Sequence, residues 1–434
     1  MAGVEEDRPR PPPARKGIHI LLMFLAAVLF MAFSYYLFHS NSPNSDVPSC
    51  HAANDRNPED STWRDSYIQL PGVSFNVEGK CDLFSGKWVC NPSGSAYTNL
   101  SCNFIETPQN CMRNGRPDTE YLYWRWKPYG CELPPFDPSK FFNAMKDKSW
   151  AFIGDSIFRN HIQSILCLLS KVETPVEIYH DETFKSRTWY FSEHNFTVAV
   201  IWSPFLVKSE ISEDDKGKSA SEVRLHVDVP EEKWTLQYNK YDYIIFSGGQ
   251  WFLKTMVVWD NGIIVGCHNC KNRSLKELGI DYPYRKVLQS VYKFMLSSDH
   301  KPLVFFRTWT PDHFEYGEWF NGGICNRTRP YGEGQYKGKP IDPMMRNIEI
   351  KEFKKAVATN SRGGARLKLL DTFHLSLLRP DGHPGPYRTF HPFDKDKNAR
   401  VQNDCLHWCL PGPIDTWNEL IMKILIDEGD VSSS

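Results

Sequence analysis

Beyond residue 147 the chain alternates between short apolar runs and longer amphipathic stretches, and this alternation excludes more folds than any other property of the sequence. The runs have the length and composition of buried strands in a parallel sheet, and they span residues 149–154, 197–202, 241–249, 302–308 and 365–371. Between them, residues 283–298 and 342–360 carry apolar side chains at helical spacing. Strands that alternate with helices predict an α/β sandwich with a mainly parallel sheet, in which reactive groups gather at the carboxyl ends of the strands.

A long apolar segment near the N-terminus predicts one transmembrane helix. Residues 18–38 contain two clearly polar side chains, His19 and Ser34, and are long enough to cross the hydrocarbon core. Basic residues precede the segment and almost none directly follow it, so we expect a cytoplasmic N-terminus and a lumenal remainder. A cleaved signal peptide is the alternative, but the run is longer than a signal-peptide core and no small-x-small cleavage site follows.

Composition indicates the compartment and the kind of partner. Eleven of the 12 cysteines lie beyond residue 80, and four glycosylation sequons begin at Asn99, Asn195, Asn272 and Asn326, both of which are typical of the secretory pathway. The 51 basic and 52 acidic residues give a net charge of -1, so no overall field exists to attract nucleic acid or an acidic polymer. A neutral partner is therefore expected. The 14 Trp and 19 Tyr supply flat rings that can stack on sugars, although most will be ordinary core residues.

The chain divides into five predicted segments. They are a cytoplasmic tail (1–17), the transmembrane helix (18–38), a lumenal stem (39–78), a Cys-rich N-terminal lobe (79–147) and a catalytic domain (148–430). The stem is rich in Ser, Asn, Asp and Pro and shows little periodicity. The lobe has five cysteines among turns and aromatic residues and is too small to stand alone, so we expect the two lobes to form one unit.

The first predicted strand ends in Gly-Asp-Ser at residues 154–156, and a helical pattern follows directly. Ser156 should therefore lie at a helix N-terminus, where free backbone N–H groups and the helix dipole can stabilise an oxyanion. Arg159, Asn160 and Gln163 follow it on one helical face, which predicts a polar pocket. An ordinary N-cap serine is the alternative.

Asp404 and His407 stand three residues apart, just before the last predicted helix at 414–428. In a single helix-like turn both side chains project to one side, so the carboxylate can orient the imidazole and stabilise its charged form. An isolated surface pair is the alternative. A serine after the first strand and an Asp–His pair before the last helix is the order that a serine esterase built on one sheet requires.

Five segments, in the same order, resemble the plant trichome birefringence-like (TBL) proteins, which are polysaccharide O-acetyltransferases of the Golgi apparatus. The segments are residues 111–118, 123–134, 154–160, 307–325 and 404–421. The resemblance runs from about residue 79 to 426 and implies a three-layer α/β/α sandwich like that of the SGNH/GDSL esterases. It also implies Ser156 as nucleophile, His407 as general base and Asp404 as the residue that orients it.

The same resemblance implies four disulfides, which are Cys81–Cys131, Cys102–Cys167, Cys111–Cys409 and Cys325–Cys405. The last two would hold both sides of the Asp404–His407 turn. The pairing of the other four cysteines stays open. For Cys267 and Cys270 a disulfide, with each other or with Cys50 or Cys90, is favoured over half a zinc site, so no metal is expected.

Further residues are candidates for the oxyanion site or its pocket: Asp155, Arg159, Asn160, Gly249 and Gln250. For Gly249, a glycine that only serves a turn is the alternative. Candidates for substrate binding follow the strand ends, and they are Trp251, Trp309, His313 and Trp319. For these, packing in the core is an equal alternative, and for His313 a structural hydrogen bond is favoured over a metal or base role.

The predicted activity is O-acetyl transfer, through an acetyl-serine intermediate, to hydroxyls of a neutral plant cell-wall polysaccharide. Residues 246–254 and 259–272 resemble the members that acetylate xyloglucan, which predicts xyloglucan side-chain galactose as acceptor. Xylan, another hemicellulose or pectin is the alternative acceptor, and an acetylesterase with the same triad or a wall-polymer lectin is the alternative activity. No bound cofactor is expected. An acetyl donor is required, either acetyl-CoA or an acetylated carrier, or a membrane protein that supplies the acetyl group. The predicted location is the Golgi membrane, as a single-pass type II protein.

Overall fold

The structure is a computed structural model of the 434-residue chain. It describes residues 81–211, 222–270, 274–360 and 364–431. The predicted tail, transmembrane helix and stem (1–17, 18–38 and 39–78) lie outside these ranges, as do Cys50 and Asn272.

The fold class predicted from the sequence needs a first correction, at its transmembrane helix. Residues 18–38 are outside the described ranges, and within those ranges no helix combines the length and the apolar character needed to span a bilayer. The longest helix of the described part, α6 (Ile341–Thr359), carries Asp, Glu, Arg and Lys residues along its length. The described residues thus give no support to the predicted transmembrane helix, nor to the predicted location as a single-pass type II protein of the Golgi membrane.

The second correction concerns the central sheet, which is mixed. Its seven strands have the order β13-β12-β9-β3-β6-β5-β4. Five of them run parallel and match the five predicted apolar runs: β3 (Ser149–Gly154), β6 (Phe196–Trp202), β9 (Tyr243–Phe246), β12 (Leu303–Arg307) and β13 (Arg366–Leu370). The prediction missed β4 (Val176–His180) and β5 (Arg187–Phe191), which extend one edge of the sheet through two antiparallel pairings, β5 with β6 and β4 with β5. β4 is largely exposed and therefore lacks the continuous apolar run that marks a buried strand.

Two smaller sheets complete the strand structure of the described part. The second sheet has the order β11-β10-β8-β7 and comprises β7 (Val207–Glu210), β8 (Val223–Pro230), β10 (Met256–Asp260) and β11 (Ile263–His268). It too is mixed, because β8 and β10 are parallel and the other two pairings are antiparallel. In the N-terminal lobe, β1 (Gly86–Cys90) pairs antiparallel with β2 (Trp124–Pro128).

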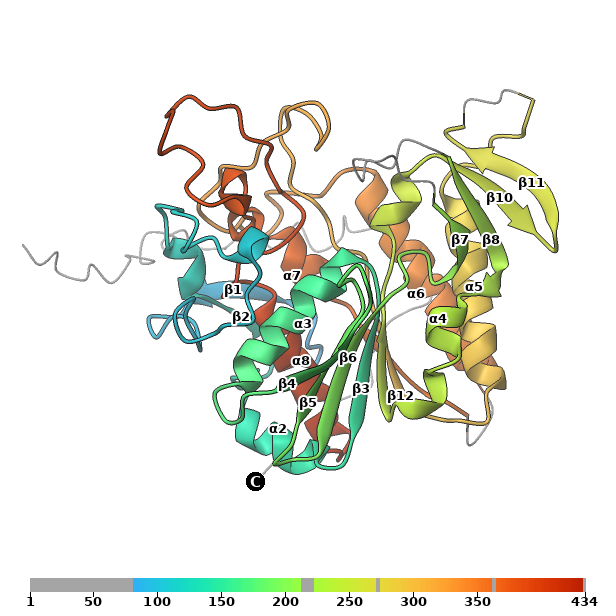
Figure 1. Cartoon of the computed structure of the whole chain (residues 1–434), viewed down its shortest axis with the longest axis horizontal. Coiled ribbons are helices and arrows are strands. Elements are labelled where there is room, and N and C mark those ends of the chain that lie inside the picture. The colour runs from blue at the N-terminus through green and yellow to red at the C-terminus, as the bar shows by residue number, and fades with distance from the viewer. Residues whose placement is uncertain (1–80, 212–221, 271–273, 361–363, 432–434) are drawn as a thin grey trace, which may run out of the picture. The chain divides into compact units, whose positions relative to one another are not determined.

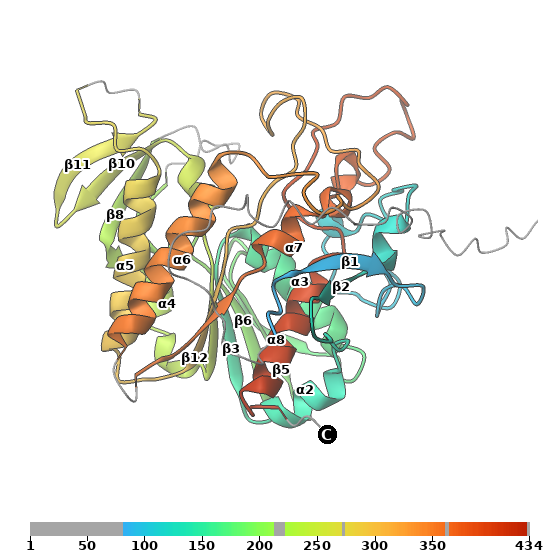
Figure 2. The same cartoon turned by 180° about the vertical axis from the view of Figure 1, so that it is seen from behind.

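Helices cover both faces of the central sheet (Figures 1 and 2). Alternate residues of β3 point to opposite sides, so that Trp150 and Phe152 belong to one apolar core while Ala151 and Ile153 belong to another. The first core includes residues of α2 (Pro138–Met145), α3 (Ser156–Leu169) and α8 (Asp415–Asp427). The second includes residues of α4 (Glu232–Thr235), α5 (Asp281–Ser297) and α6. The result is a three-layer α/β/α sandwich.

Short helices occupy several connections. α7 (Phe373–Leu377) follows β13. The 3-10 helices are η3 (Thr107–Gln109), η4 (Glu120–Tyr123), η5 (Tyr238–Lys240), η6 (Gln250–Leu253), η7 (Pro380–Gly382) and η8 (Pro386–Arg388).

Disulfides tie the N-terminal lobe to the sandwich. The structure contains the four pairings that the resemblance implied, Cys81–Cys131, Cys102–Cys167, Cys111–Cys409 and Cys325–Cys405, and also joins Cys267 to Cys270. The lobe also shares the first apolar core, in which Trp88 and Trp126 are buried. The Trp88 indole N–H donates to the carbonyl of Leu375, 2.8 Å away.

Candidate active site

Ser156 is the first residue of α3, and one residue, Asp155, separates it from the end of β3. Asp155 caps the helix, because its Oδ1 accepts a hydrogen bond from the N–H of Ile157 at 3.0 Å. A Cβ on Gly154 would lie 2.2 Å from the carbonyl oxygen of Ser247, which follows β9. Glycine is thus required at this position for the two strands to approach each other, and the serine emerges at the carboxyl edge of the sheet.

The structure brings Ser156, His407 and Asp404 together. The Nε2 atom of His407 lies 2.8 Å from Ser156 Oγ, and its Nδ1 atom lies 2.9 Å from Asp404 Oδ2 and 3.1 Å from Oδ1. With a proton on Nδ1 donated to Asp404, Nε2 is free to accept the proton of the Ser156 hydroxyl. The spatial order is therefore that of a nucleophile, a base and a carboxylate that orients the base.

Charge stabilises this arrangement. Burial by itself raises the pKa of Asp404, but the positive charge of His407 and the hydrogen bonds from its ring and backbone hold that pKa well below its usual range. Burial lowers the pKa of His407, and the Asp404 carboxylate more than reverses this, so the pKa of His407 is raised above its ordinary value. His407 is thus a stronger base than a free imidazole.

Several contacts hold the turn that carries His407. Asn160 of α3 uses both ends of its amide on the backbone of Trp408, accepting from its N–H at 2.6 Å and donating to its carbonyl at 3.2 Å. The disulfides Cys325–Cys405 and Cys111–Cys409 fix the turn on either side. The sequence pattern predicts Asn160 as a candidate for the oxyanion pocket. Its amide is instead engaged in holding the His407 turn against the nucleophile helix.

The other candidates for the oxyanion pocket have other partners in the structure. Arg159 forms an ion pair with Glu106 at 3.1 Å. The Gln250 amide donates to the carbonyl of Thr310 at 2.8 Å. Gly249 has φ of 140° and packs so closely on Trp309 that a Cβ would lie 2.6 Å from the indole, which supports the turn-glycine alternative. The oxyanion donors therefore stay a prediction.

Asp155 is buried directly behind the nucleophile. Burial raises the pKa of its carboxyl, and the guanidinium of Arg307 works in the opposite direction. Its negative charge also raises the pKa of His407. Asp155 thus has an electrostatic effect on the base besides its role as helix cap.

Burial separates the four predicted substrate-binding residues into two groups. Trp309 and His313 are 1% and 3% exposed, so neither offers a surface to a sugar, and the core alternative applies to both. The Trp309 indole donates to Asp342 at 2.8 Å, and His313 contacts His383. Trp251 is partly exposed and packs edge-on against Trp202. Trp319 is 60% exposed.

The sequence did not reveal a buried charge network behind Ser156. Arg307, the last residue of β12, lies between the rings of Phe158 and Trp417 at 4.9 and 4.8 Å, and burial lowers its pKa to about 10. Glu349 of α6 accepts from the backbone N–H of Trp309 at 2.7 Å and from the Tyr284 hydroxyl, and burial raises its pKa to about 8. The only available signal was an arginine closing an apolar strand, and its partners are distant in sequence.

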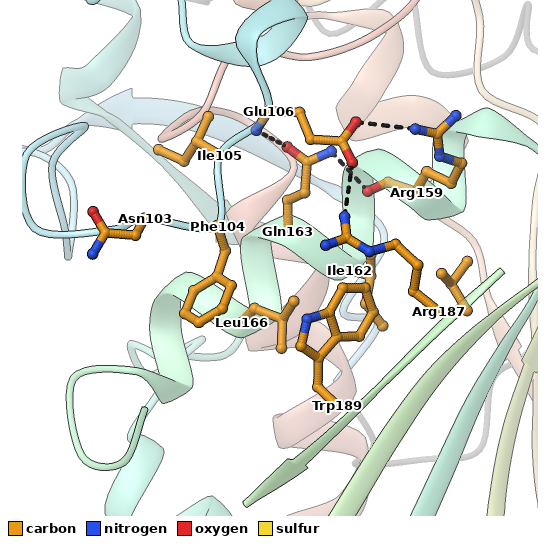
Figure 3. Close-up of a pocket in the computed structure, with 11 residues that line it drawn as sticks. Asn103, Phe104, Ile105, Glu106, Arg159, Ile162, Gln163, Leu166, Arg187 and Trp189 are labelled. Carbon is orange, nitrogen blue, oxygen red and sulfur yellow. Dashed lines mark hydrogen bonds and ion pairs between the residues drawn. The ribbon is translucent and has the colours of Figure 1, made fainter. Parts of the chain in front are cut away.

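A cavity of about 140 Å³ lies along α3, beginning one turn beyond Ser156 (Figure 3). Arg159, Gln163 and Leu166 line it from the helix. At its edge Glu106 pairs with Arg159 at 3.1 Å and with Arg187 at 3.2 Å, and its backbone N–H donates to Gln163 at 2.8 Å. Arg187 also pairs with Glu177, so two carboxylates neutralise the two guanidinium groups, and the cavity wall suits a neutral ligand better than an ion.

The predicted glycosylation sites differ in accessibility. Asn195 and Asn326 are exposed, and Asn99 is partly exposed. Their modification stays a prediction.

The fold and site together define a class of protein. A serine at a strand-to-helix turn, hydrogen-bonded to a histidine that a carboxylate orients, on an α/β sandwich, is the arrangement of serine acyl-esterases and acyltransferases.

Comparison with known proteins identifies the family. Residues 133–424 match the GDSL/SGNH-like acyl-esterase family found in Pmr5 and Cas1p, and residues 79–132 match the PMR5 N-terminal domain. The chain belongs to this family, within its trichome birefringence-like group. It is 55% identical to the protein trichome birefringence-like 26 of Arabidopsis thaliana over 350 residues, which cover 80% of this chain and 78% of that protein. It is 38% identical to xyloglucan O-acetyltransferase 1 of the same plant over 441 residues, covering 98% of this chain and 99% of that protein. Xyloglucan O-acetyltransferase 1 of Populus trichocarpa is 41% identical over 354 residues, covering 80% and 82%.

Proposed function

We propose that this protein transfers acetyl groups to hydroxyls of a plant cell-wall polysaccharide through an acetyl-serine at Ser156. The observation that carries the proposal is the 2.8 Å contact between Ser156 Oγ and His407 Nε2, with Asp404 bound to the opposite ring nitrogen. Membership in an acyl-esterase family that includes polysaccharide O-acetyltransferases supports the same chemistry.

The reaction proceeds in two halves. In the first, His407 takes the Ser156 proton while Oγ attacks the acetyl carbonyl of the donor, and the imidazolium then protonates the departing group. In the second, His407 takes the proton of a sugar hydroxyl, whose oxygen attacks the acetyl-serine carbonyl. The sugar ester leaves and the proton returns to Ser156. The donor is acetyl-CoA or an acetylated carrier, and the chain itself needs no cofactor for either half.

The acceptor we propose is xyloglucan, at its side-chain galactose. The support is similarity to two relatives named xyloglucan O-acetyltransferase 1, at 38% and 41% identity. The small net charge of the chain also favours a neutral polymer over an acidic one. Xylan is the competing acceptor in the experiment below.

The test uses purified protein with an activated acetyl ester or acetyl-CoA as donor. Unacetylated oligosaccharides of xyloglucan and of xylan serve as acceptors, and mass spectrometry detects the added acetyl group and its position. We expect acetylation of galactose-bearing xyloglucan fragments and none with Ser156→Ala, which serves as the control. If xylan alone gains acetyl groups, the acceptor assignment is wrong.

An esterase with the same three residues is the second candidate, because His407 retains 21% side-chain exposure and water can therefore reach the acetyl-serine. It predicts that acetylated fragments lose their acetyl groups and that unacetylated fragments gain none. That outcome would overturn the transferase proposal while leaving the role of Ser156 intact.

A further inference from the structure

One loop of the protein exposes three large aromatic side chains. Residues 315–324, here called the aromatic loop, are closed by two backbone hydrogen bonds between Glu315 and Ile324, at 2.8 and 2.9 Å. Within the loop Tyr316, Trp319 and Phe320 are 88%, 60% and 69% exposed. Several large apolar rings exposed close together on a protein surface usually mark a binding site.

The aromatic loop has a defined conformation. The N–H of Gly323 donates to the carbonyl of Glu318 at 2.9 Å, and the Asn321 side chain accepts from the N–H of Glu318. Lys339 ties the loop to its base by contacting Glu318 at 2.9 Å and Asp312 at 2.6 Å. A loop held this way presents its rings with little loss of conformational freedom on binding.

The aromatic loop is also joined to the turn that carries the proposed base. The disulfide Cys325–Cys405 begins one residue after the loop and ends two residues before His407. The Gln402 amide donates to the carbonyl of Trp319 at 3.1 Å. In both views the orange loop after β12 and the red loop before α8 lie together at one end of the central sheet, the end at which α3 begins (Figures 1 and 2).

We propose that the aromatic loop binds the acceptor polysaccharide, with its rings stacked on the apolar faces of neutral sugar residues beside the one that is acetylated. This inference rests on the proposed function and adds a binding subsite to it. Flat aromatic rings suit the C–H faces of pyranoses. The acidic groups of the loop are already paired, Glu318 with Lys339 and Glu315 with Arg327 at 2.7 Å, so the surface favours a neutral chain over a charged polymer or an anionic membrane.

The test measures binding without turnover. Wild-type protein and the double variant Trp319→Ala/Phe320→Ala are titrated with xyloglucan oligosaccharides by calorimetry, in the absence of donor. We expect the double variant to bind at least about tenfold more weakly, since each ring–sugar stack is comparable to an aromatic pair. Tyr179→Ala is the matched control, because Tyr179 on the edge strand β4 is similarly exposed at 56%.

Two outcomes would overturn the binding proposal. The first is equal affinity for the oligosaccharide in the double variant and the wild type. The second is that the wild type binds phosphatidylcholine vesicles or self-associates, and that the double variant loses this property while its sugar affinity is unchanged. Formation of acetyl-serine from an aryl acetate is measured in parallel. Wild-type protein and Tyr179→Ala should both form acetyl-serine even if the double variant binds sugar as tightly as they do, so a failure of the loop proposal is distinguishable from a failure of the proposed chemistry.

A different observation carries a second inference, about a pair of buried histidines. His313 Nδ1 lies 2.7 Å from His383 Nε2. The outer nitrogens of the pair each contact a backbone carbonyl, His313 Nε2 that of Leu377 at 2.9 Å and His383 Nδ1 that of His407 at 2.8 Å. A carbonyl oxygen can only accept a hydrogen bond, so each outer nitrogen must carry a proton, and the hydrogen bond between the two rings needs a third proton. Two neutral imidazole rings carry only two N–H protons.

We infer that His313 and His383 share one proton beyond those of two neutral rings, and that His383 acts as a positioning residue that fixes the His407 backbone. Burial opposes even one extra proton, because it lowers the pKa of His313 to about 4 and that of His383 further. The two carbonyl contacts and the contact between the rings favour the extra proton, since together they require three protons. Two neutral rings would instead place lone pairs against each other. The His383 ring also stacks on Trp408, with centroids 4.3 Å apart.

The charges around the pair are largely matched. Asp381 faces it but is paired with Arg379 at 2.8 Å. Arg116 donates to the carbonyls of His383 and Asp381, at 2.8 and 2.7 Å. More distant are Asp404, Glu315 and Lys339, which act on the pair electrostatically. Since Asp381 and Arg379 neutralise each other, the extra proton of the pair is a positive charge that His407 should sense.

Two variants separate this role from a purely structural one. His313→Phe keeps the His383 contact with His407 but removes the shared proton, whereas His383→Phe removes the contact and keeps a flat ring against Trp408. The rate of acetyl-serine formation from an aryl acetate is followed against pH. Losing a nearby positive charge raises the pKa of His407, so in His313→Phe the acidic limb should move up by about half a pH unit or more. His383→Phe should lose at least about tenfold in rate.

A structural role alone predicts slower rates with an unmoved acidic limb, and that result would overturn the inference. A measurement on the wild type tests the same inference if the variants fail to fold. Protein labelled with ¹⁵N-histidine should show a proton coupled to nitrogens of two imidazole rings. Neutral-ring signals for both residues at pH 7 would contradict the shared proton.

Discussion

Asp404 controls His407 through its two carboxylate oxygens. Oδ2 accepts from the ring, while Oδ1 accepts from the backbone N–H groups of Leu406 and His407, at 3.2 and 3.0 Å. The backbone contacts orient the carboxylate and the ring contact selects the tautomer with a free Nε2. One side chain thus sets the geometry, the proton location and the basicity of the proposed base.

Asp404→Asn is expected to lower the rate of acetyl-serine formation by about 10³- to 10⁴-fold, because the amide favours the wrong tautomer. The pH dependence should change as well. Transfer needs neutral His407, so the wild-type rate rises as pH increases through a pKa that Asp404 has raised. Without the carboxylate the imidazolium loses its stabilisation, and the midpoint should move to lower pH. Rapid-mixing kinetics with an aryl acetate would measure both changes, and an unshifted midpoint would contradict this assignment.

Asn160→Ala should impair the site without touching a reacting atom. The variant removes two hydrogen bonds to the Trp408 backbone and leaves buried backbone groups unpaired, at a cost of about 1–3 kcal/mol. The His407 turn then loses its direct tie to α3, so we expect a rate loss of about tenfold or more. Gln163→Ala, on the next turn of the same helix, is the control for rate and for denaturant midpoint. Equal rates in the two variants would show that the turn is held by other contacts.

At the level of elements, the site depends on loops clamped to a rigid sheet. Ser156 lies at the junction of β3 and α3, whereas His407 lies in an irregular segment that disulfides join to other parts of the chain. Such a segment has few backbone hydrogen bonds of its own. The two disulfides, here called clamps, therefore fix its conformation in place of a helix or strand.

Removing one clamp tests this dependence. The double variant Cys325→Ser/Cys405→Ser opens a loop of 80 residues, for which chain entropy predicts a loss of roughly 4 kcal/mol, and frees the turn beside His407. We expect a lower melting temperature and a lower rate per folded molecule. Cys267→Ser/Cys270→Ser removes a disulfide spanning 3 residues on the second sheet and is the matched control. It should change both quantities little, and an equal rate loss in the two variants would argue against a local clamp.

The sequence predicted the structure best where a pattern of side chains has a single physical explanation. Continuous apolar runs identified the five parallel strands, because only burial on both faces explains them. β4 was missed because most of its residues face solvent. Ser156, Asp404 and His407 were identifiable from motif and order, whereas Arg307 and Glu349 meet only in three dimensions. The burial of Trp309 likewise depends on packing by α6, which no local pattern reveals.

For the whole molecule, the buried titratable groups define how stability depends on pH. Burial lowers the pKa of His161 to about 3, and raises that of Glu349 to about 8. The first group binds a proton mainly when the chain unfolds, and the second binds one mainly when it is folded. The two contributions to stability oppose each other between about pH 4.5 and 6.5, the ordinary pKa values of Glu and His, and above pH 6.5 that of Glu349 remains.

From these two groups the unfolding free energy is therefore expected to change little between about pH 4.5 and 6.5 and to fall above pH 6.5. Below about pH 6.5 the unfolded chain protonates His161 while the folded chain does not, and this loss of stability offsets the gain from Glu349 down to about pH 4.5. Below that pH the unfolded Glu349 is protonated too, so stability falls as pH decreases further. Above about pH 6.5, Glu349 stays protonated in the folded state while the unfolded carboxylate is ionised, so stability falls as pH rises toward 8. The raised pKa of His407 acts in the same direction on this side. Between pH 6.5 and 8 Glu349 should contribute about 1–2 kcal/mol of this loss, and Glu419, whose pKa burial also raises to about 8, should contribute a similar amount. Thermal unfolding at several pH values would measure it. Glu349→Gln, whose single carbonyl oxygen can accept from the Trp309 N–H while its amide group donates to the Tyr284 hydroxyl, should make the alkaline side less steep. An alkaline side of equal slope in that variant would mean that other groups control stability there.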